Sequence, residues 1–353
     1  MTYTIVALGG GYGGLTALNQ LLTDLPDNVK LILVDRMPYQ GLKTEYYALA
    51  AGTVAEVDIR VQFPADPRLE IRHGEVTSIR LNEKRVMIAD QDPLEYDILI
   101  IGLGCSDKYH NVPGAAQHTL GIQSLPAARQ TYTALNNIAP YGQVSIVGGG
   151  LSGVELAAEL REARPDLNIR IIDRGASVLS YTPARLQKFV RDWFERHDVA
   201  IVSNSSVTKI EPGIIYTEND EFVSDEIVWT AGVQPNPIVQ QLDLAKDNSG
   251  RILLNSFHQI PQHPDVYVVG DCASLPFPPS AHLAEEQGKQ IAAVISANLK
   301  GETPTLGPIK LKGVLGSLGK KSGFGVMGKR TVMLGRVPRL LKSGVLWIVK
   351  HQS

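Results

Sequence analysis

The sequence has little of what several common kinds of site require. Only two of its 353 residues are cysteine, Cys105 and Cys272, and they are far apart. This excludes a CxxC or CxxxxC redox pair and suits a reducing compartment, and both thiols are predicted to be small buried side chains. No apolar run approaches the ~18–20 residues of a membrane span. The chain enters a strand almost at once, so no signal peptide is predicted, and no metal site is predicted either.

Acidic residues are missing from one segment. The chain has a net charge of −2, yet residues 309–353 hold ten Lys and Arg and no Asp or Glu, which leaves residues 1–308 at −12. A basic tail on an acidic body indicates an anionic partner, either membrane lipid or nucleic acid. Because no recognised binding motif accompanies the charge, nucleic acid is not predicted as a partner.

What the sequence does contain is the same glycine pattern twice. Gly9-Gly10-Gly11-Tyr12-Gly13-Gly14 follows the apolar run 3–8, and Gly148-Gly149-Gly150-Leu151-Ser152-Gly153 follows the run 144–147. Each is followed by a helical stretch, a second apolar run and an acid: Asp35 lies 21 residues after Gly14, and Asp173 lies 20 residues after Gly153. Two such motifs, each in its strand–turn–helix–strand–acid context, are a strong sign of two bound dinucleotides.

Each part of the pattern has a physical role. The first glycine permits a tight turn, the second lets the backbone approach a pyrophosphate, and the third lets the helix pack closely against the sheet. The pyrophosphate lies at the positive end of the helix, and the acid accepts hydrogen bonds from a ribose. The residues predicted to hold the two dinucleotides are Gly9, Gly11, Gly13, Gly14, Asp35, Arg36, Gly148, Gly150, Leu151, Gly153, Asp173 and Arg174.

Strands that alternate with helices predict an α/β fold with two parallel sheets. The simplest organisation is a first dinucleotide-binding domain of residues 1–112 and 256–308, with a second Rossmann-like domain, residues 113–255, inserted in it. Residues 309–353 form a short basic C-terminal segment. Strands of the two domains are predicted at 3–8, 31–34, 96–101, 143–147, 168–172, 226–229 and 265–269, and helices at 126–138, 152–164, 183–196 and 281–299.

Further residues resemble a known superfamily. Trp229-Thr230-Ala231-Gly232 and Val268-Val269-Gly270-Asp271 resemble the two-dinucleotide flavoprotein reductases. The resemblance implies that the N-terminal fingerprint holds FAD and the internal one NAD(P)H, and that Asp271 contacts the ribityl or pyrophosphate part of FAD. Other residues then expected near the cofactors are Gly104, Gly232, Gly270 and Ala281.

A narrower resemblance concerns the tail. Lys312-Gly313-Val314-Leu315-Gly316-Ser317-Leu318-Gly319 and Gly325-Val326-Met327-Gly328 resemble the C-terminal domain of type II NADH dehydrogenases, as do Asp35-Arg36 and the segment 46–52. Those enzymes are single-chain, non-proton-pumping NADH:quinone oxidoreductases held on a membrane face by C-terminal amphipathic helices. The resemblance implies a cytoplasmic protein on the cytoplasmic face of a membrane, and allows a homodimer. It also implies that Glu155 lies between nicotinamide and flavin.

Four residues are predicted to take part in the chemistry. Reduction of a quinone consumes two protons, so a nearby carboxylate or histidine would help; Glu155, His282 and Glu286 are the candidates. His282 and Glu286 stand where the resembled family has two glutamines, which puts the quinone pocket in question. Lys43 could reach the flavin and stabilise its reduced anion. Each also has a structural interpretation: the Glu155 carboxylate is favourable near the N-terminus of a helix, His282 satisfies a helix N-terminus, and Glu286 and Lys43 are solvated surface residues.

The tail itself predicts an amphipathic helix. One face would carry Val337, Leu340, Leu341, Val345 and Ile348, with Arg336, Arg339, Lys342 and Lys350 around it and Trp347 as an interface anchor. A short basic helix of this kind lies in a membrane surface rather than spanning it. The alternative is a helix docked on the body of the protein or on a second subunit.

Two residues bear on the choice between NADH and NADPH. Asp173 suits the free 2′-hydroxyl of NADH and repels the 2′-phosphate of NADPH, although Arg174 beside it could accommodate that phosphate. The sequence therefore favours NADH, and the resemblance implies an FAD-dependent NADH dehydrogenase that reduces a quinone. Two alternatives stay open: a soluble reductase of an iron–sulfur protein, and a slowly reacting redox-sensing flavoprotein. A sulfide:quinone oxidoreductase is less favoured, because that chemistry needs two or three placed cysteines.

Overall fold

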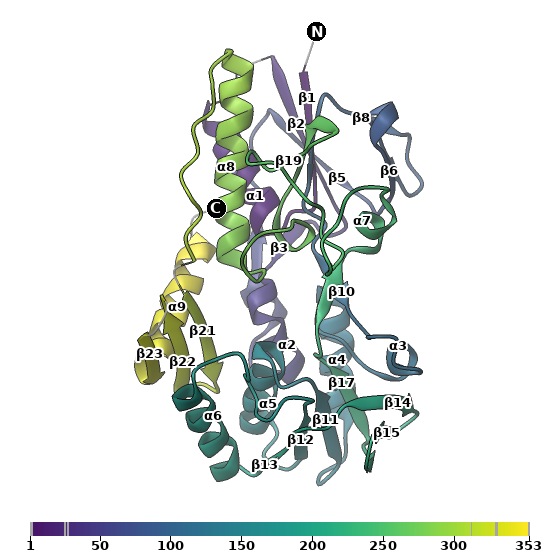
Figure 1. The fold of residues 1–353 in the computed structure, drawn as a ribbon, viewed down its shortest axis with the longest axis vertical. Helices are drawn as coiled ribbons and strands as arrows, with labels where there is room; N and C mark the ends of the chain where they lie inside the picture. The colour runs from purple at the N-terminus through teal and green to yellow at the C-terminus, as the bar shows by residue number, and fades with distance from the viewer. Residues whose placement is uncertain (1–2, 25, 27, 312, 329–330, 352–353) are drawn as a thin grey trace.

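The computed structural model describes residues 3–24, 26, 28–311, 313–328 and 331–351. Two sheets form its two halves, one above the other in Figure 1; the lower is parallel throughout, and the upper is parallel except for its edge strand β19, which pairs antiparallel with β20. The upper sheet has the strand order β19-β20-β9-β1-β2-β5. Its strands are β1 (Tyr3–Leu8), β2 (Val29–Asp35), β5 (Leu69–His73), β9 (Ile98–Ile101), β19 (Gln259–Ile260) and β20 (His263–Val268).

The upper sheet is buried on both faces, as its nearly continuous apolar strands require. Helices α1 (Tyr12–Asp24) and α8 (Ala281–Lys300) pack against each other on one face, side by side in Figure 1. The antiparallel sheet of β6 (Val76–Arg80), β7 (Arg85–Ile88) and β8 (Leu94–Glu95) contributes to the core on the other face. Strands from the beginning of the chain thus share one sheet with strands from residues 259–268.

The lower sheet has the order β13-β12-β11-β17, and all its pairs are parallel. Its strands are β11 (Gln143–Val147), β12 (Asn168–Ile172), β13 (Val199–Val202) and β17 (Glu226–Trp229). The longer helices of this half are α4 (Leu125–Asn137), α5 (Leu151–Ala163) and α6 (Ala184–Arg196). An antiparallel sheet of β14 (Val207–Glu211), β15 (Ile214–Thr217) and β16 (Glu221–Val223) lies beside them. The predicted α/β architecture with two parallel sheets is confirmed.

A two-stranded ribbon connects the halves. Strand β10 (Cys105–Asp107) leaves the upper half and pairs antiparallel with β18 (Val233–Pro235), which returns from the lower half. The chain therefore enters and leaves the lower half at neighbouring positions, as Figure 1 shows at β10. The remaining short elements are β3 (Tyr39–Gly41), β4 (Arg60–Gln62), α2 (Tyr46–Ala51), α3 (Ala115–His118) and α7 (Pro237–Gln241), with 3₁₀ turns at Lys43–Glu45, Glu56–Ile59, Leu81–Glu83 and Gly270–Cys272.

The C-terminal segment contains more than the predicted helix. An antiparallel sheet of β21 (Gly313–Leu318), β22 (Ser322–Met327) and β23 (Thr331–Gly335) precedes α9 (Arg336–His351). Strand β21 packs against α5, and this yellow segment lies beside α5 and α6 in Figure 1. Lys312, the first residue of the resembled motif, lies outside the described residues. None of the described helices has the length and apolar character needed to span a membrane.

Candidate functional site

The first fingerprint has the geometry that a dinucleotide requires. Gly9 has φ +94°, and a Cβ there would lie 2.4 Å from the carbonyl oxygen of Gly102. A Cβ on Gly14 would lie 2.2 Å from the oxygen of Gly9, so only glycine lets α1 begin this close to β1. A Cβ on Gly11, by contrast, would meet no described atom within 4 Å. Its position faces open space, where a pyrophosphate could approach the backbone.

The second fingerprint repeats this geometry. Gly148 has φ +109°, and its Cβ would lie 2.7 Å from the backbone of Ala231. A Cβ on Gly153 would lie 2.0 Å from the oxygen of Gly148, whereas on Gly150 it would meet nothing within 4 Å among the described residues. Both loops are therefore tight where the fold needs glycine and open where a ligand would lie. The residues present fit two dinucleotides.

The two acids hold their fingerprint loops in the same way. Asp35 accepts hydrogen bonds from the backbone N–H of Gly10 (2.7 Å) and of Met37 (2.8 Å). Asp173 accepts them from Gly149 (2.6 Å) and Gly175 (2.7 Å). Each carboxylate oxygen has a second lone pair, so both acids can still accept a ribose hydroxyl. Of the neighbouring arginines, Arg36 lines the cavity described next and Arg174 is exposed.

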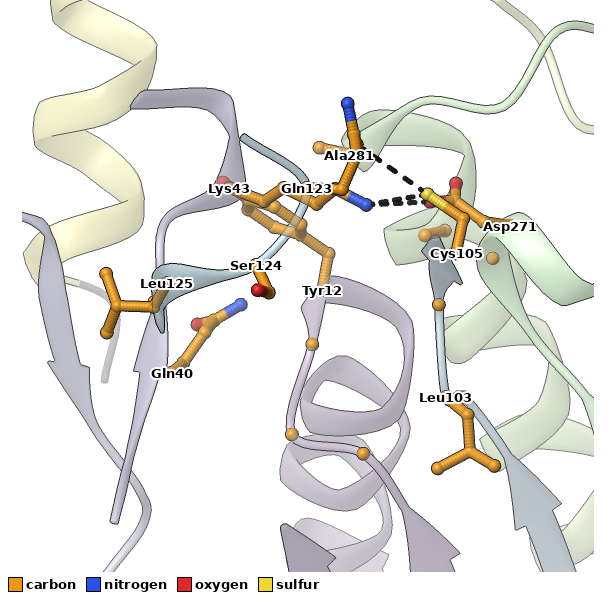
Figure 2. A pocket seen from close by; sticks show the side chains of 18 of the residues that line it. Tyr12, Gln40, Lys43, Leu103, Cys105, Gln123, Ser124, Leu125, Asp271 and Ala281 are labelled. Atoms are coloured by element: carbon orange, nitrogen blue, oxygen red, sulfur yellow. Dashed lines mark hydrogen bonds and ion pairs between the residues drawn. The ribbon is translucent and has the colours of Figure 1, made fainter. Parts of the chain in front are cut away.

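A cavity of about 610 Å³ runs from the first fingerprint to the beginning of α5. Figure 2 shows part of it from close by. Its lining comes from both halves of the protein and from the C-terminal segment. It includes residues 9–14, 35–37, 43, 47, 102–105, 151, 152, 155, 233, 269–271, 279–281, 315 and 342. The cavity therefore joins both halves of the protein and the C-terminal segment. From the second fingerprint only Leu151 and Ser152 take part among the described lining residues.

Lys43 lines this cavity and contacts Cys105 and Asp271. Its ammonium lies 2.8 Å from the Cys105 sulfur and 3.3 Å from Oδ2 of Asp271, as the dashed lines in Figure 2 show. Burial alone would lower the pKa of Lys43, but the Cys105 thiol and the Asp271 carboxylate outweigh it and raise the pKa above its ordinary value. Lys43 is therefore a fixed positive charge in the cavity wall. Cys105 is half-buried rather than buried, Cys272 is buried, and both are free.

The other residues predicted to contact the first dinucleotide also line this cavity. Gly104 has φ +70° and would place a Cβ in space free of described atoms. Gly270, at φ +72°, donates its N–H to the buried Gln287 (2.9 Å), while Asp271 and Ala281 line the cavity. Ala281 is the first residue of α8, whose N-terminus therefore faces the cavity. Gly232, predicted for the second dinucleotide, has φ +135° and follows β17 directly after Ala231, whose backbone contacts Gly148.

Glu155 is buried, although it reaches the cavity wall. The side chain is 4% exposed. Its Oε1 accepts hydrogen bonds from Lys342 Nζ (2.5 Å) and from the backbone N–H (2.9 Å) and hydroxyl (3.2 Å) of Ser317. The C-terminal segment therefore supplies both partners of Glu155. The predicted catalytic carboxylate is joined to a lysine and a serine that the sequence did not connect with it.

Lys342 corrects one part of the tail prediction. It was expected among the cations that surround a lipid-facing helix, but it is 8% exposed and turned toward the protein. Its ammonium also contacts the hydroxyl of Tyr47 (2.5 Å) and Oε1 of Glu45 (3.6 Å). Burial raises the pKa of Glu45, and the Lys342 charge opposes that rise. Arg339 likewise turns inward to the carbonyl of Gly319.

His282 and Glu286 do not lie in the cavity. Neither is among its described lining residues. His282 lies 3.4 Å from the carbonyl oxygen of Lys310, and Glu286 forms an ion pair with Lys289 one helical turn away. Both belong to α8, whose cavity-facing residues are Ala281 and Ala284. The structure therefore brings Glu155 and Lys43 into one cavity and leaves the other two predicted catalytic residues outside it.

Comparison with known proteins agrees with this geometry. The sequence model of the pyridine nucleotide-disulphide oxidoreductase family matches residues 3–288. NADH dehydrogenase-like protein YutJ of Bacillus subtilis is 53% identical over 352 residues, covering 99% of each chain. Demethylphylloquinone reductase NdbB of Synechocystis is 29% identical over 386 residues, covering 98% of this chain and 96% of the relative. NDH2 from Plasmodium falciparum in complex with NADH has a similar structure, with a TM-score of 0.86 at 16% identity, over 100% of this chain and 95% of that one.

The fold, the two fingerprints and the relatives agree. The disulphide in the family's name has no counterpart here, because the only two cysteines are free and far apart in sequence. The predicted resemblance to two-dinucleotide reductases of the NADH dehydrogenase kind is confirmed. The chain belongs to the pyridine nucleotide-disulphide oxidoreductase family and is an NAD(P)H oxidoreductase of the NADH dehydrogenase-like kind.

Proposed function

We propose that this chain is an FAD-dependent NADH dehydrogenase that passes electrons from NADH to a quinone at a membrane face. One observation carries the proposal: a single cavity extends from the first fingerprint to Leu151 and Ser152, in the last part of the second fingerprint, and to Glu155 just beyond it. Two dinucleotides bound at these fingerprints would bring their reactive ends together in that cavity.

The difference between the two fingerprints supports FAD at the first. All of residues 9–14 line the cavity, together with Asp271 and the N-terminus of α8, and this enclosure suits a cofactor that stays bound. Residues 148–150 are not among the described lining residues. A dinucleotide at that more open position could exchange in every catalytic cycle, as NADH must. Asp173 then favours NADH over NADPH, because a carboxylate repels a 2′-phosphate.

The bound flavin supplies the chemistry of accepting a hydride from NADH and passing two electrons on. The protein positions the reactants and stabilises charge. Lys43 is held in the cavity wall by Cys105 and Asp271, and a preorganised positive charge stabilises negative charge that develops beside it. The Lys43 side chain is partly buried, at 31% exposure, and this partial removal from water strengthens the interaction.

The group around Glu155 is suited to hold protons. A quinone takes up two protons on reduction, and Glu155, Lys342 and Tyr47 form a connected chain of exchangeable protons at the cavity wall. All the Glu155 bonds described above end on Oε1, so Oε2 is the atom through which Glu155 could act on a ligand. The acceptor is therefore proposed to bind where Tyr47, Leu315 and Lys342 line the cavity. In NdbB, by its name, the acceptor is demethylphylloquinone.

The outer face of α9 supports attachment to a membrane surface. Val337 (60% exposed), Leu340 (70%) and Val345 (54%) present apolar surface to solvent, while Pro338 and Lys342 face the protein. This is the reverse of an ordinary surface helix, which buries its apolar side. A helix that exposes its apolar face beside basic residues suits an anionic lipid surface. A second copy of the chain is the other candidate for this face.

Three measurements test the proposal. Release of the cofactor by heat, followed by chromatography, should identify FAD rather than FMN, and steady-state kinetics with NADH and a soluble naphthoquinone should show a ping-pong pattern. Full-length protein should float with anionic liposomes at low salt, whereas Leu340→Glu should not. NADH oxidation by Leu340→Glu in solution should be unchanged. Protein that stays at the bottom of the gradient would contradict membrane attachment.

A further inference from the structure

A histidine occupies the turn that follows β10, where the ribbon between the two halves ends. His110 and Asn111 have φ +51° and +59°, and across them the N–H of Val112 donates to the carbonyl oxygen of Tyr109 (2.9 Å). Two successive residues with positive φ are typical of a type I′ turn. Glycine adopts this conformation without steric cost, whereas a histidine is held there by its surroundings, and such backbone gathers at functional sites. His110 has no part in the function proposed above.

The imidazole of His110 is bonded to the segment that follows β17. Its Nε2 lies 2.9 Å from the carbonyl oxygen of Ala231. Because a carbonyl oxygen only accepts, this nitrogen carries the proton and donates. The ring also covers Gly232: a Cβ on that glycine would lie 3.2 Å from Nε2 and, its chain neighbours aside, would meet no other described residue within 4 Å. The absence of a side chain at position 232 therefore leaves room for the imidazole.

The turn that carries His110 is itself fixed. The Trp229 indole donates to the carbonyl oxygen of Lys108 (3.0 Å), and the Tyr109 ring lies against that indole, with the ring centroids 5.7 Å apart. The N–H of Lys108 donates to the carbonyl oxygen of Gly232 (3.0 Å). The side chain of His110 therefore reaches out from a backbone that is already held, and it can fix what it binds.

The segment that His110 holds leads from the second fingerprint to the cavity. At one end, the Thr230 hydroxyl donates to the carbonyl oxygen of Gly148 (3.0 Å), and at the other end Val233 lines the cavity. The segment follows the carboxyl end of a parallel strand, which is where α/β folds bind their ligands. A dinucleotide with its pyrophosphate at the fingerprint and its reactive ring in the cavity has to extend along this direction. Residues 231 and 232 lie between the two ends.

We propose that His110 is a positioning residue for the nicotinamide half of NADH. The inference rests on the proposed function, in which the second fingerprint binds NADH. By holding the Ala231 carbonyl and covering Gly232, the imidazole fixes the backbone past which the nicotinamide reaches the cavity. Because these contacts lie beyond the fingerprint loop, they act on hydride transfer rather than on binding of the pyrophosphate. A misplacement of about 1 Å can cost on the order of 100-fold in rate, so one hydrogen bond at this position matters.

Two variants separate this role from a purely structural one. Glycine suits φ +51°, so the midpoint of urea unfolding should not fall in His110→Gly, although the bond to Ala231 is lost. The rate of flavin bleaching at saturating NADH, measured by stopped flow, should nevertheless fall at least about tenfold. His110→Gln keeps a side-chain N–H donor and should restore most of this rate. ADP-ribose carries the pyrophosphate without the nicotinamide, and calorimetry should show equal binding to both variants and to the unchanged protein.

His118 provides a matched control. It is exposed at the end of α3, which packs against β14, so His118→Ala should change neither the bleaching rate nor ADP-ribose binding. An unchanged bleaching rate in His110→Gly would overturn the inference. So would a loss of rate that His110→Gln does not restore, or one matched by an equal loss of ADP-ribose binding. If NADH does not bleach the flavin of the unchanged protein, the proposed function fails instead.

Discussion

Lys342 gives the sharpest prediction about how the C-terminal segment is held. The side chains of Lys342 and Glu155 are 10% and 5% exposed, and the Lys342 ammonium lies 2.5 Å from Oε1 of Glu155. Lys342→Met preserves most of the side-chain volume and removes the charge. It leaves Glu155 and Glu45 buried with no opposite charge in this group.

The expected cost can be set against an exposed pair of similar length. Removing one partner of a buried pair destabilises a protein by ~3–5 kcal/mol, because the other charge stays buried without compensation. Lys188 and Asp192 lie 2.7 Å apart but are 68% and 45% exposed, so Lys188→Met should cost at most ~0.5 kcal/mol. Lys342→Met combined with Glu155→Gln should recover part of the loss, since the uncompensated charge at position 155 is then absent.

These differences can be measured by urea unfolding of the flavin-loaded protein, with tryptophan fluorescence as the signal. A change in stability shifts the urea concentration at the unfolding midpoint and leaves the dependence of the unfolding free energy on urea unchanged. We expect a large shift for Lys342→Met, a small one for Lys188→Met, and an intermediate one for the double variant. If Lys342→Met and Lys188→Met cost the same within ~1 kcal/mol, the buried network does not hold α9 and the argument fails.

Three further predictions concern the fingerprints and the ribbon between the two halves. Gly150 has an extended backbone and open space at its Cβ, so Gly150→Ala should leave stability and flavin content unchanged. It should raise the KM for NADH at least about tenfold, the effect of ~1.4 kcal/mol of lost contact; an unchanged KM would remove the pyrophosphate from this position. Asp173→Ala should raise the KM for NADH more than the KM for NADPH in steady-state assays, and equal changes would refute the cofactor choice. Burial raises the pKa of Asp107 to about 6, an effect that Lys43 partly opposes, and its Oδ1 has no hydrogen-bond partner in the described part of the chain. An unfolded aspartate loses its proton near pH ~3.9, so ionisation of Asp107 destabilises the fold as pH rises toward and past 6. Asp107→Asn should therefore be more stable than the unchanged protein at pH 8 and about equal at pH 4, whereas a loss of stability at pH 8 would show that the charge is needed.

Local signals predicted the two parallel sheets well. The expected strands 3–8, 143–147, 168–172 and 226–229 match β1, β11, β12 and β17 to the residue. Each is a short, mostly apolar run, and two of the four, β1 and β11, are bounded by glycine on at least one side, so there the pattern and the turn chemistry agree. The helix expected at 281–299 ends one residue later, at Lys300.

The C-terminal sheet could not be read in the same way. Glycines in β21 and β22 resemble turn residues, and glycine within a strand usually weakens it. Here it permits close packing: a Cβ on Gly323 would lie 2.7 Å from the oxygen of Gly316, and one on Gly316 would lie 2.8 Å from Leu151. The first contact joins the neighbouring strands β21 and β22, and the second depends on α5, which is distant in sequence.

The group around Glu155 was also only half predictable. Its position after the second fingerprint singled out Glu155, but Lys342 lies 187 residues further along the chain. The helical pattern of the tail placed Lys342 among the cations around a lipid-facing side, and no sequence signal distinguishes a lysine that is buried beside a distant glutamate. His282 and Glu286 were chosen by alignment with two glutamines, which says nothing about the direction of their side chains.

The most direct test of the account is anaerobic stopped-flow measurement of flavin absorbance. The flavin-loaded protein is mixed first with NADH and then with a soluble naphthoquinone. The account predicts fast bleaching by NADH and fast recovery of the oxidised spectrum with the quinone. Bleaching without recovery would contradict quinone as the acceptor, and no bleaching at all would contradict the transfer of a hydride between the two fingerprints.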